Sequence, residues 1–420
     1  TVATLKRGFA GKNFENIANY LLTTNGIADR YMCLADFENY LDVYHIMDEK
    51  YKDTKSFNQM SLVNISQAGR FAADRSINKT ECFLEIHLEY GGNNMEKETV
   101  KSIHKIAVLT SGGDAPGMNA TIRSIVRAGI DSGLSVYGIE DGYRGLVEGR
   151  VYEMDRNAVT NIINRGGTVL GSARLPEFSK DEVAQIAVEQ LHNRGIEAVI
   201  TIGGDGTYRG ALKLTQMGIN CVGVPGTIDN DIASTEFTIG FDTAVNTAVD
   251  AIDKLRDTSN SHQRCSIVEV MGRYCGDIAY AAALATGADL VITSETGFDL
   301  NEVIDTVKRC QGHKSRHVLI VITEHITDVM ELAKKIKEYT GFDARATILG
   351  HIQRGGSPSP FDRVLATRLG IAAVDELIKG NGGVCMGIFK NEVVATPIEE
   401  ALTMKKQMFK GYKEMTKRVS

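Results

Sequence analysis

Residues 198–207 read AVITIGGDGT, and this stretch decides the fold class. Its apolar start lacks an alternating pattern, which predicts a strand buried on both faces, as in a parallel sheet. The glycines and Asp205 predict a sharp turn, and a helix is expected from about Tyr208. The same order begins at residues 106–109, which lead into SGGDAPG and a helix near Asn119.

Three further apolar segments end in polar turns. Residues 221–224, 265–270 and 317–322 lead into PGTIDND, MGRYCGD and TEH. Buried strands that alternate with helices indicate an α/β protein whose parallel sheets carry helices on both faces. Ligands bind beyond the carboxyl ends of such strands, so these turns predict a binding site.

The composition is that of an ordinary globular protein, with 43% hydrophobic and 24% charged residues. A length of 420 residues predicts two or three domains. The net charge of -6 disfavours a nucleic-acid partner. We expect no membrane span and no secretion signal, because neither apolar pattern is present. The seven cysteines contain no CxxC pair, which favours reduced thiols in a cytoplasmic protein.

Phosphoryl transfer needs groups that bind polyphosphate, hold a metal ion and accept a proton. The turn Ser111–Asp114 is suited to bind phosphate through backbone N–H groups, although it also fits a plain strand-to-helix turn. Asp205 is suited to a phosphate-bound magnesium ion, the alternative being a helix cap. Within Thr227–Asp231, Asp229 is suited to accept a hydroxyl proton and Asp231 to support it or the metal ion, although such residues are also common in turns.

A set of basic residues beside the turns is the candidate phosphate-binding group. His351 and Arg354 lie three apart in LGHIQRGGSP, close enough to converge on one phosphate. Guanidinium groups suit phosphate oxygens because they bind them in a bidentate manner. Any one of these residues alone is more typical of a surface or structural position, so the prediction depends on their number: Arg174, Arg264, Arg273, Arg345, His351 and Arg354.

Eight segments in this order resemble the bacterial ATP-dependent 6-phosphofructokinases, with similarity from about Lys105 to Lys410. They are LTSGGDAPGMNA, NRGGTVLGSAR, IGGDGTY, VPGTIDNDI, RDTSNSHQR, VEVMGRYCGD, ITEH and LGHIQRGGSP. The resemblance implies two Rossmann-like parallel-sheet domains. A larger, ATP-binding domain is expected from residues 95–239 and about 353–405, and a smaller, sugar-phosphate-binding domain from residues 240–352 and about 406–420.

The resemblance implies transfer of the ATP γ-phosphate to the 1-hydroxyl of fructose 6-phosphate, giving fructose 1,6-bisphosphate and ADP in glycolysis. Asp229 is the implied general base, flanked by Thr227 and Asp231, and Arg273 bridges the phosphoryl group and the sugar. The implied ATP contacts are Gly113, Arg174, Leu175, Gly204, Asp205, Gly206 and Thr207, with Asp205 also on Mg²⁺. The other implied sugar-phosphate contacts are Arg264, Met271, Gly272, Glu324, Arg345, His351 and Arg354.

Two of these arginines, Arg264 and Arg345, come from a neighbouring subunit in this family, which implies a homotetramer. The family also has an effector site between subunits, for a nucleoside diphosphate such as ADP or for phosphoenolpyruvate. Arg123 and Arg127 lie four apart on one helix face and match it. Arg156 and Arg256 match as well, and the other implied effector positions are Asp289, Arg316 and His317. Asn161, His313, Ser315 and the shorter acid Asp289 depart from the usual pattern, which leaves the strength and sign of regulation open.

Two glycines bear on the phosphoryl donor. Pyrophosphate-dependent relatives carry segments similar to GGDD and PKTIDND. In these segments an acid and a lysine occupy the space of the nucleotide α-phosphate. Gly206 and Gly226 stand at these positions, so ATP is expected, with a pyrophosphate-dependent enzyme as the alternative. A dinucleotide-binding oxidoreductase would need a GxGxxG opening, which SGGDAPG does not supply. NAD and lipid kinases share GGDGT but lack the TIDND and MGRYCGD segments.

Residues 1–94 are expected to form a mainly helical extension outside the kinase. The segments DRYMCLADFENYLDVYHIMDEKY and NISQAGRFAADRSI resemble the C-terminal end of a glycogen or maltodextrin phosphorylase. This resemblance covers residues 1–78, ends after Lys79, and lacks the part that binds pyridoxal phosphate. A misjoined gene pair, with the kinase starting at Met95, is one hypothesis, and a true fusion, in which the segment tethers the kinase to another enzyme, is the other. A binding-only protein whose N-terminal part recruits glucan is a separate alternative. On either hypothesis the extension has no catalytic competence of its own.

Overall fold

The computed structural model describes residues 103–313, 317–406 and 412–419. The chain divides into two compact units, residues 1–97 and 98–420, and the described residues belong to the second. The extension predicted for residues 1–94 lies outside the described residues, as do Ser315 and Arg316. In the described part of the chain, no helix is long and apolar enough to cross a membrane.

The first sheet has seven strands in the order β11-β10-β5-β4-β1-β2-β3. The inner strands are parallel, as predicted, whereas the edge strands β3 and β11 run antiparallel to their neighbours. The sequence pattern does not predict the two edge strands, because no glycine-rich turn follows either of them. The strands are β1 (Lys105–Thr110), β2 (Ser135–Ile139), β3 (Val151–Met154), β4 (Ala198–Gly203), β5 (Asn220–Pro225), β10 (Val384–Phe389) and β11 (Glu392–Pro397).

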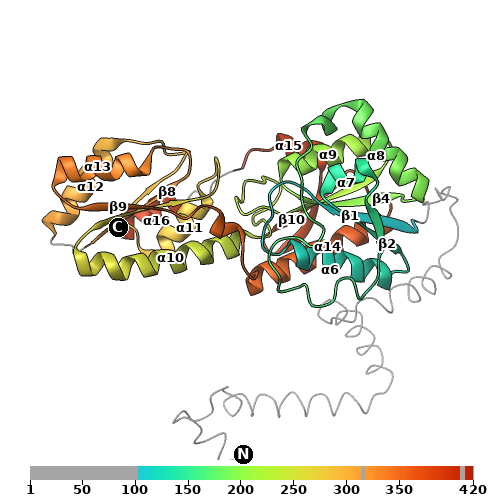
Figure 1. The fold of residues 1–420 in the computed structure, drawn as a ribbon, viewed down its shortest axis with the longest axis horizontal. Helices are drawn as coiled ribbons and strands as arrows, with labels where there is room; N and C mark the ends of the chain where they lie inside the picture. Colours follow the sequence, from blue (N-terminus) through green and yellow to red (C-terminus); the bar gives the residue numbers. More distant parts are fainter. Residues whose placement is uncertain (1–102, 314–316, 407–411, 420) are drawn as a thin grey trace, which may run out of the picture. The chain divides into compact units, whose positions relative to one another are not determined.

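Helices cover both faces of this sheet because side chains of its strands alternate between the faces. In β1, Ile106 and Val108 pack in a core with α6 and α14, whereas Ala107 and Leu109 pack in a core with α7, α8, α9 and α15 (Figure 1). These helices are α6 (Met118–Asp131), α7 (Gly142–Glu148), α8 (Asp181–Arg194), α9 (Asp205–Gln216), α14 (Pro360–Ile378) and α15 (Ile398–Thr403), with a 3₁₀ turn, η2 (Pro176–Ser179).

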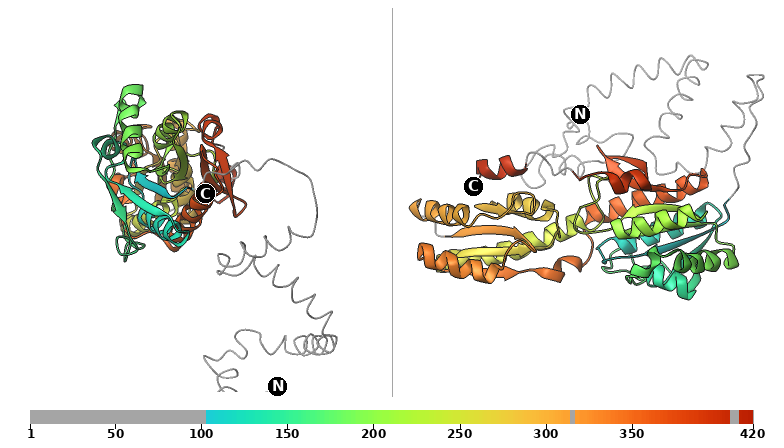
Figure 2. Two further views of the ribbon diagram at one scale, coloured as in Figure 1. Left: turned by 90° about the vertical axis from the view of Figure 1, so that its right-hand side faces the viewer. Right: turned by 90° about the horizontal axis from the view of Figure 1, so that it is seen from above.

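The second sheet has four parallel strands in the order β7-β8-β6-β9. Helices α12 and α13 cover one face and α10 and α11 the other, so each sheet lies between two helical layers (Figures 1 and 2). The strands are β6 (Cys265–Val270), β7 (Leu290–Ile292), β8 (Val318–Thr323) and β9 (Ala344–Ile348). The helices are α10 (Phe241–His262), α11 (Asp277–Thr286), α12 (Leu300–Gly312), α13 (Val329–Thr340) and α16 (Tyr412–Val419), with a 3₁₀ turn, η3 (Gly350–Arg354).

The five predicted strands differ from the observed ones by no more than one residue at either end. The helix after GGDGT begins earlier than predicted, at Asp205 instead of Tyr208. The reason is that Gly204 is the N-cap, so Asp205 and Gly206 already belong to the first turn of the helix. The glycine-rich turn therefore carries the free N–H groups of a helix N-terminus, which attract anions.

Candidate active site

The turns after β1, β4, β5 and β6 meet at a cavity of about 1010 Å³. Parallel pairing in register aligns the ends of these strands: Thr110 lies beside Ile202, and Gly203 beside Pro225. The cavity is lined by twelve of the predicted site residues: Gly113, Arg174, Leu175, Gly204, Asp205, Gly206, Thr207, Thr227, Asp229, Asp231, Arg273 and Arg354. The structure therefore brings together most of the residues that the sequence marks for the active site.

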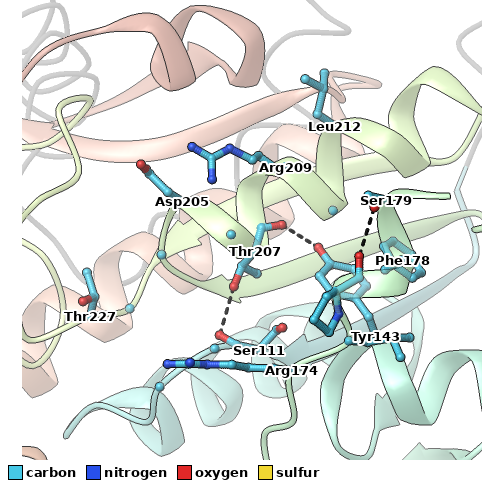
Figure 3. Close-up of a pocket in the computed structure, with 18 of the residues that line it drawn as sticks. Ser111, Tyr143, Arg174, Phe178, Ser179, Asp205, Thr207, Arg209, Leu212 and Thr227 are labelled. Atoms are coloured by element: carbon cyan, nitrogen blue, oxygen red, sulfur yellow. Dashed lines mark hydrogen bonds between the residues drawn. The ribbon is translucent and has the colours of Figure 1, made fainter.

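Asp205 is the first residue of α9 and points into this cavity (Figure 3). It makes no side-chain capping hydrogen bond, because the N-cap position is taken by Gly204. The structure therefore does not support the alternative that this carboxylate caps the helix. Next to it, Gly206 has open space where a Cβ atom would lie, with no atom within 4 Å.

Thr207 joins the two glycine-rich turns. Its hydroxyl group donates a 2.9 Å hydrogen bond to the backbone oxygen of Ser111, and its own backbone oxygen accepts one of 2.6 Å from the Tyr143 hydroxyl (Figure 3). Because the hydroxyl group is engaged in this way, it fixes the spacing between the turns. The N–H groups of both turns are thereby held at the cavity wall.

Several cavity residues are absent from the sequence prediction. Tyr143 of α7 stacks on Phe178 of η2, with ring centroids 4.3 Å apart and an interplanar angle of 24° (Figure 3). Arg209 and Lys213 follow Asp205 at intervals of four residues on α9, and both line the cavity. Residues four apart lie on the same face of an α-helix, and this spacing from Asp205 is the sequence signal that could have predicted Arg209 and Lys213.

Asp229 is 7% exposed, and its Oδ1 atom is buried without a hydrogen-bond partner in the described structure. Burial raises the pKa of Asp229 and Glu324 adds to this, whereas Arg354 and Arg273 act in the opposite direction. Burial also raises the pKa of Asp231 to about 6, helped by the negative charges of Asp229 and Asp205. A carboxylate whose pKa is raised in this way is suited to accept a proton.

Asn230, between these two acids, has a left-handed backbone with φ of 53°. Its Nδ2 atom donates to Asp277 Oδ2 at 2.7 Å and to the backbone oxygen of Glu236 at 3.1 Å. Its Oδ1 atom accepts the N–H of Thr238 at 2.9 Å. The side chain thus fixes a backbone conformation that a non-glycine residue seldom adopts, and with it the directions of the neighbouring acids.

The turn after β6 places Arg273 at the cavity. Gly272 and Arg273 have φ of 135° and 57°, so both have left-handed backbones. The N–H of Arg273 donates a 3.0 Å hydrogen bond to Glu324 Oε1, in the turn after β8. The N–H of Met271 donates to Oε1 of the fully buried Gln353 at 3.3 Å. Glu324, Met271 and Gly272 do not line the cavity, but they shape the turn that presents Arg273.

Of the four residues predicted to bind the sugar phosphate, Arg354 lines the cavity, and His351, Arg264 and Arg345 are not among its lining residues. Arg354 of η3 lines it and donates to the backbone oxygen of Asp114 at 3.3 Å, whereas His351 of the same turn is exposed. Arg264 and Arg345 both pair with Asp343, at 2.9 and 3.5 Å, on the second sheet. These two arginines are not among the cavity-lining residues of the described chain.

The predicted effector residues fall into two groups, one at α6 and one at the second sheet. Arg123 and Arg127 lie on α6, and burial together with Arg127 lowers the pKa of Arg123. Arg156 belongs to the same group, because it pairs at 3.1 Å with Asp131, the last residue of α6.

The second group lies at the second sheet. Burial, with Arg256, lowers the pKa of His317, and Asp289 opposes this. The Nε and Nη2 atoms of Arg256 are buried without hydrogen-bond partners among the described residues, whereas Asp289 accepts the N–H of Leu319 at 2.8 Å. Neither the cavity at the glycine-rich turns nor the cavity lined by Asp289 and Arg309 brings the two groups together.

The donor set of the cavity fits magnesium. Among the described residues, no group of three His, Cys, Asp or Glu side chains is arranged to hold a metal ion. Mg²⁺ usually binds through one or two carboxylates together with the phosphates of its substrate, and does not need a dedicated cage. Asp205 begins α9, makes no side-chain capping hydrogen bond and lines the cavity. Its carboxylate is therefore a suitable oxygen ligand for a magnesium ion that is bound to substrate phosphates.

Comparison with protein families gives two matches along the chain. The phosphofructokinase family matches residues 105–377. The carbohydrate phosphorylase family matches residues 2–81, in agreement with the resemblance of the N-terminal segment.

An ATP-dependent 6-phosphofructokinase of Tolumonas auensis is 56% identical over 307 residues, which cover 73% of this chain and 96% of the relative. A solved phosphofructokinase of Saccharomyces cerevisiae superposes with a TM-score of 0.67 at 33% identity, covering 75% of this chain and 47% of the yeast chain. A pyrophosphate-dependent phosphofructokinase of Marinobacter aquaeolei superposes with a TM-score of 0.67 at 21% identity, covering 73% of this chain and 86% of the other. The last match supports the fold alone.

Proposed function

Because the chain belongs to the phosphofructokinase family, we propose that it is an ATP-dependent 6-phosphofructokinase. It would transfer the γ-phosphate of ATP to the 1-hydroxyl of fructose 6-phosphate, giving fructose 1,6-bisphosphate and ADP. The observation that carries this proposal is that Asp205, Asp229 and Arg273 line one and the same cavity, together with Gly206, beside which space is open. It combines the groups that bind polyphosphate, accept a proton and stabilise transferred charge.

The nucleotide is proposed to bind along the first sheet. The N-terminal turn of α9 and the turn after β1 offer backbone N–H groups to the phosphates, and Arg174 adds a positive charge. Mg²⁺ would be held by Asp205 and would neutralise charge on the β- and γ-phosphates. The stacked rings of Tyr143 and Phe178 form the apolar part of the same cavity.

Asp229 is the proposed general base. Its carboxylate lines the cavity and would accept the proton of the sugar 1-hydroxyl, while Thr227 Oγ1 accepts the backbone N–H of Asp229 at 3.3 Å. Arg273 is proposed to stabilise the phosphoryl group during transfer, and Arg354 to bind the sugar phosphate. Deprotonating the hydroxyl and neutralising the transferred charge are the two tasks left to the protein.

The location of Arg264 and Arg345 supports an active site that two neighbouring subunits form together. Both pair with Asp343 on the second sheet and neither lines the cavity, so within one chain they do not complete it. We propose a homotetramer in which these arginines bind the 6-phosphate in a neighbouring subunit's site. By the same reasoning, the two effector groups, at α6 and at the second sheet, would form an anion site between subunits, for ADP or phosphoenolpyruvate.

The donor is tested by an exchange of substrates. Purified protein is supplied with fructose 6-phosphate and magnesium, and with either ATP or pyrophosphate. Product from ATP alone is expected, because Gly206 leaves the nucleotide space open. Product from pyrophosphate would favour the pyrophosphate-dependent alternative. If neither donor gives product, a chain starting at Met95 distinguishes obstruction by the N-terminal extension from a wrong proposal.

A further inference from the structure

Lys406 follows α15 in a segment without regular secondary structure. Its Nζ atom donates hydrogen bonds to three backbone oxygens, those of Ile232 at 3.3 Å, Thr235 at 2.8 Å and Glu236 at 3.3 Å. All three belong to the loop that begins directly after Asp231. An ammonium group has three N–H donors. The donor capacity of Lys406 is therefore used entirely by this loop.

One of these oxygens links Lys406 to the proposed catalytic turn. The backbone oxygen of Glu236 accepts from Lys406 Nζ at 3.3 Å and also from Asn230 Nδ2 at 3.1 Å. Asn230 stands between Asp229 and Asp231 and needs its side-chain bonds to keep its left-handed backbone. A single oxygen atom thus separates Lys406 from the residue that orients both acids.

Asn230 is also held from a second side, by helix α11. Asp277, the first residue of this helix, is 5% exposed and accepts from Asn230 Nδ2 at 2.7 Å. Burial lowers the pKa of Lys406, while Asp277, Cys275, Asp231 and Glu236 act in the opposite direction. The ammonium charge therefore lies among the acids around the turn as well as bonding to the loop.

We propose that Lys406 is a positioning residue for phosphoryl transfer. By holding residues 232–236 it fixes Asn230, and through Asn230 it fixes the carboxylates of Asp229 and Asp231. This inference rests on the proposed function, in which Asp229 is the base. Lys406 does not line the cavity, so its loss should change turnover more than substrate binding.

The test compares two neighbouring lysines in the full-length chain. Lys406→Met keeps the side-chain length and removes the three donors, and Lys405→Met is the matched control because Lys405 is exposed. The readouts are kcat, KM for each substrate, and hydrogen exchange of the backbone amides. In Lys406→Met, we expect kcat to fall about 10- to 100-fold with each KM within about threefold, because small misplacement of a reacting group affects the rate. Amide exchange should accelerate in residues 227–238 and stay unchanged in β1 and β8, and Lys405→Met should match the parent.

Other outcomes overturn the proposal. A kcat within about twofold of the parent, or a rise in KM that accounts for the loss, would exclude a positioning role. Faster exchange throughout the molecule would identify Lys406 as a general structural residue. Unchanged exchange in residues 227–238 would show that it does not hold the loop. If the parent itself lacks activity with both donors, the proposed function fails, and the exchange comparison still decides whether Lys406 holds the loop.

Discussion

Arg354 covers Gly113: its guanidinium group occupies the space that a Cβ atom at position 113 would need. The two residues come from distant parts of the chain, Gly113 from the turn after β1 and Arg354 from η3. Arg354 also donates to the backbone oxygen of Asp114. The proposed nucleotide turn and the proposed sugar-phosphate arginine are therefore in direct contact, and a change in one is transmitted to the other.

Gly113→Ala should displace Arg354 and leave the fold intact, because the colliding group is the end of a flexible side chain. We expect KM for fructose 6-phosphate to rise about tenfold, the loss of roughly one charge-assisted hydrogen bond. Steady-state kinetics with each substrate varied, beside a thermal melt, would measure this. Gly312→Ala is the stability control, since a Cβ at Gly312 meets no atom within 4 Å and its backbone is not left-handed. A Gly113→Ala enzyme with parental KM would contradict the contact.

Gly206→Asp should abolish the use of ATP without unfolding the protein. A Cβ at position 206 meets no atom within 4 Å, so the new carboxylate fits and places a negative charge in the nucleotide space. We expect kcat/KM for ATP to fall at least about 100-fold, or about 2.7 kcal/mol. The measurement is kinetics with ATP and with pyrophosphate.

Gly206→Ala is the matched control for this change, because it adds a Cβ without charge. Since Gly206 lies in the first turn of α9, alanine should raise stability by about 0.5–1 kcal/mol and leave ATP kinetics close to parental. An equal loss of ATP use in both variants would mean that bulk, and not charge, keeps the nucleotide out.

The predicted residues that line the cavity are those whose place in the fold follows from the local sequence pattern. Asp205 and Asp229 follow buried strands directly, so the rule that parallel strands end at one edge places them together. Arg209 and Lys213 obey a helical period that starts at Asp205, and could have been predicted from it. The five strands were predictable because each is a mainly apolar run that ends in a polar turn.

Other residues were not predictable, because their roles depend on contacts between distant segments. Tyr143 meets Phe178 only once α7 and η2 pack together, and Gln353 meets Met271 only across two turns. Lys406 reaches the loop after Asp231 from the far end of the chain. No periodicity or spacing encodes such contacts, which arise from the three-dimensional arrangement alone.

Asp229→Asn should lower kcat by about 10²–10⁴, the usual contribution of a general base, with smaller changes in KM. The parent rate should also fall on the acid side, because a base acts only as the carboxylate and burial raises the pKa of Asp229. Asp231, with a pKa of about 6, titrates beside it, so the acid limb belongs to the pair. The measurement is kcat/KM against pH.

Glu324→Gln checks the sign of this pH dependence. Glu324 raises the pKa of Asp229, and the amide oxygen of glutamine still accepts the N–H of Arg273. Removing this negative charge should lower the pKa of Asp229 and move the acid limb to lower pH. A limb that moves to higher pH, or an acid limb that persists with full amplitude in Asp229→Asn, would contradict the role of Asp229.

Mixed oligomers would test whether the active site is shared between subunits. Arg345→Ser and Asp229→Asn should each be nearly inactive, the first for lack of a phosphate ligand and the second for lack of the base. If Arg345 serves a neighbouring subunit's cavity, a mixed pair has one site with both defects and one site with none. Random reassembly of equal amounts should then restore about a quarter of the parental activity, because half of the pairs are mixed and half of their sites are intact. The assay is activity after joint dissociation and reassembly, with each variant treated alone as the control. A mixture no more active than the two variants alone would place Arg345 and Asp229 in the same subunit's site, and the pairing of Arg345 with Asp343 would then be the state that substrate has to break.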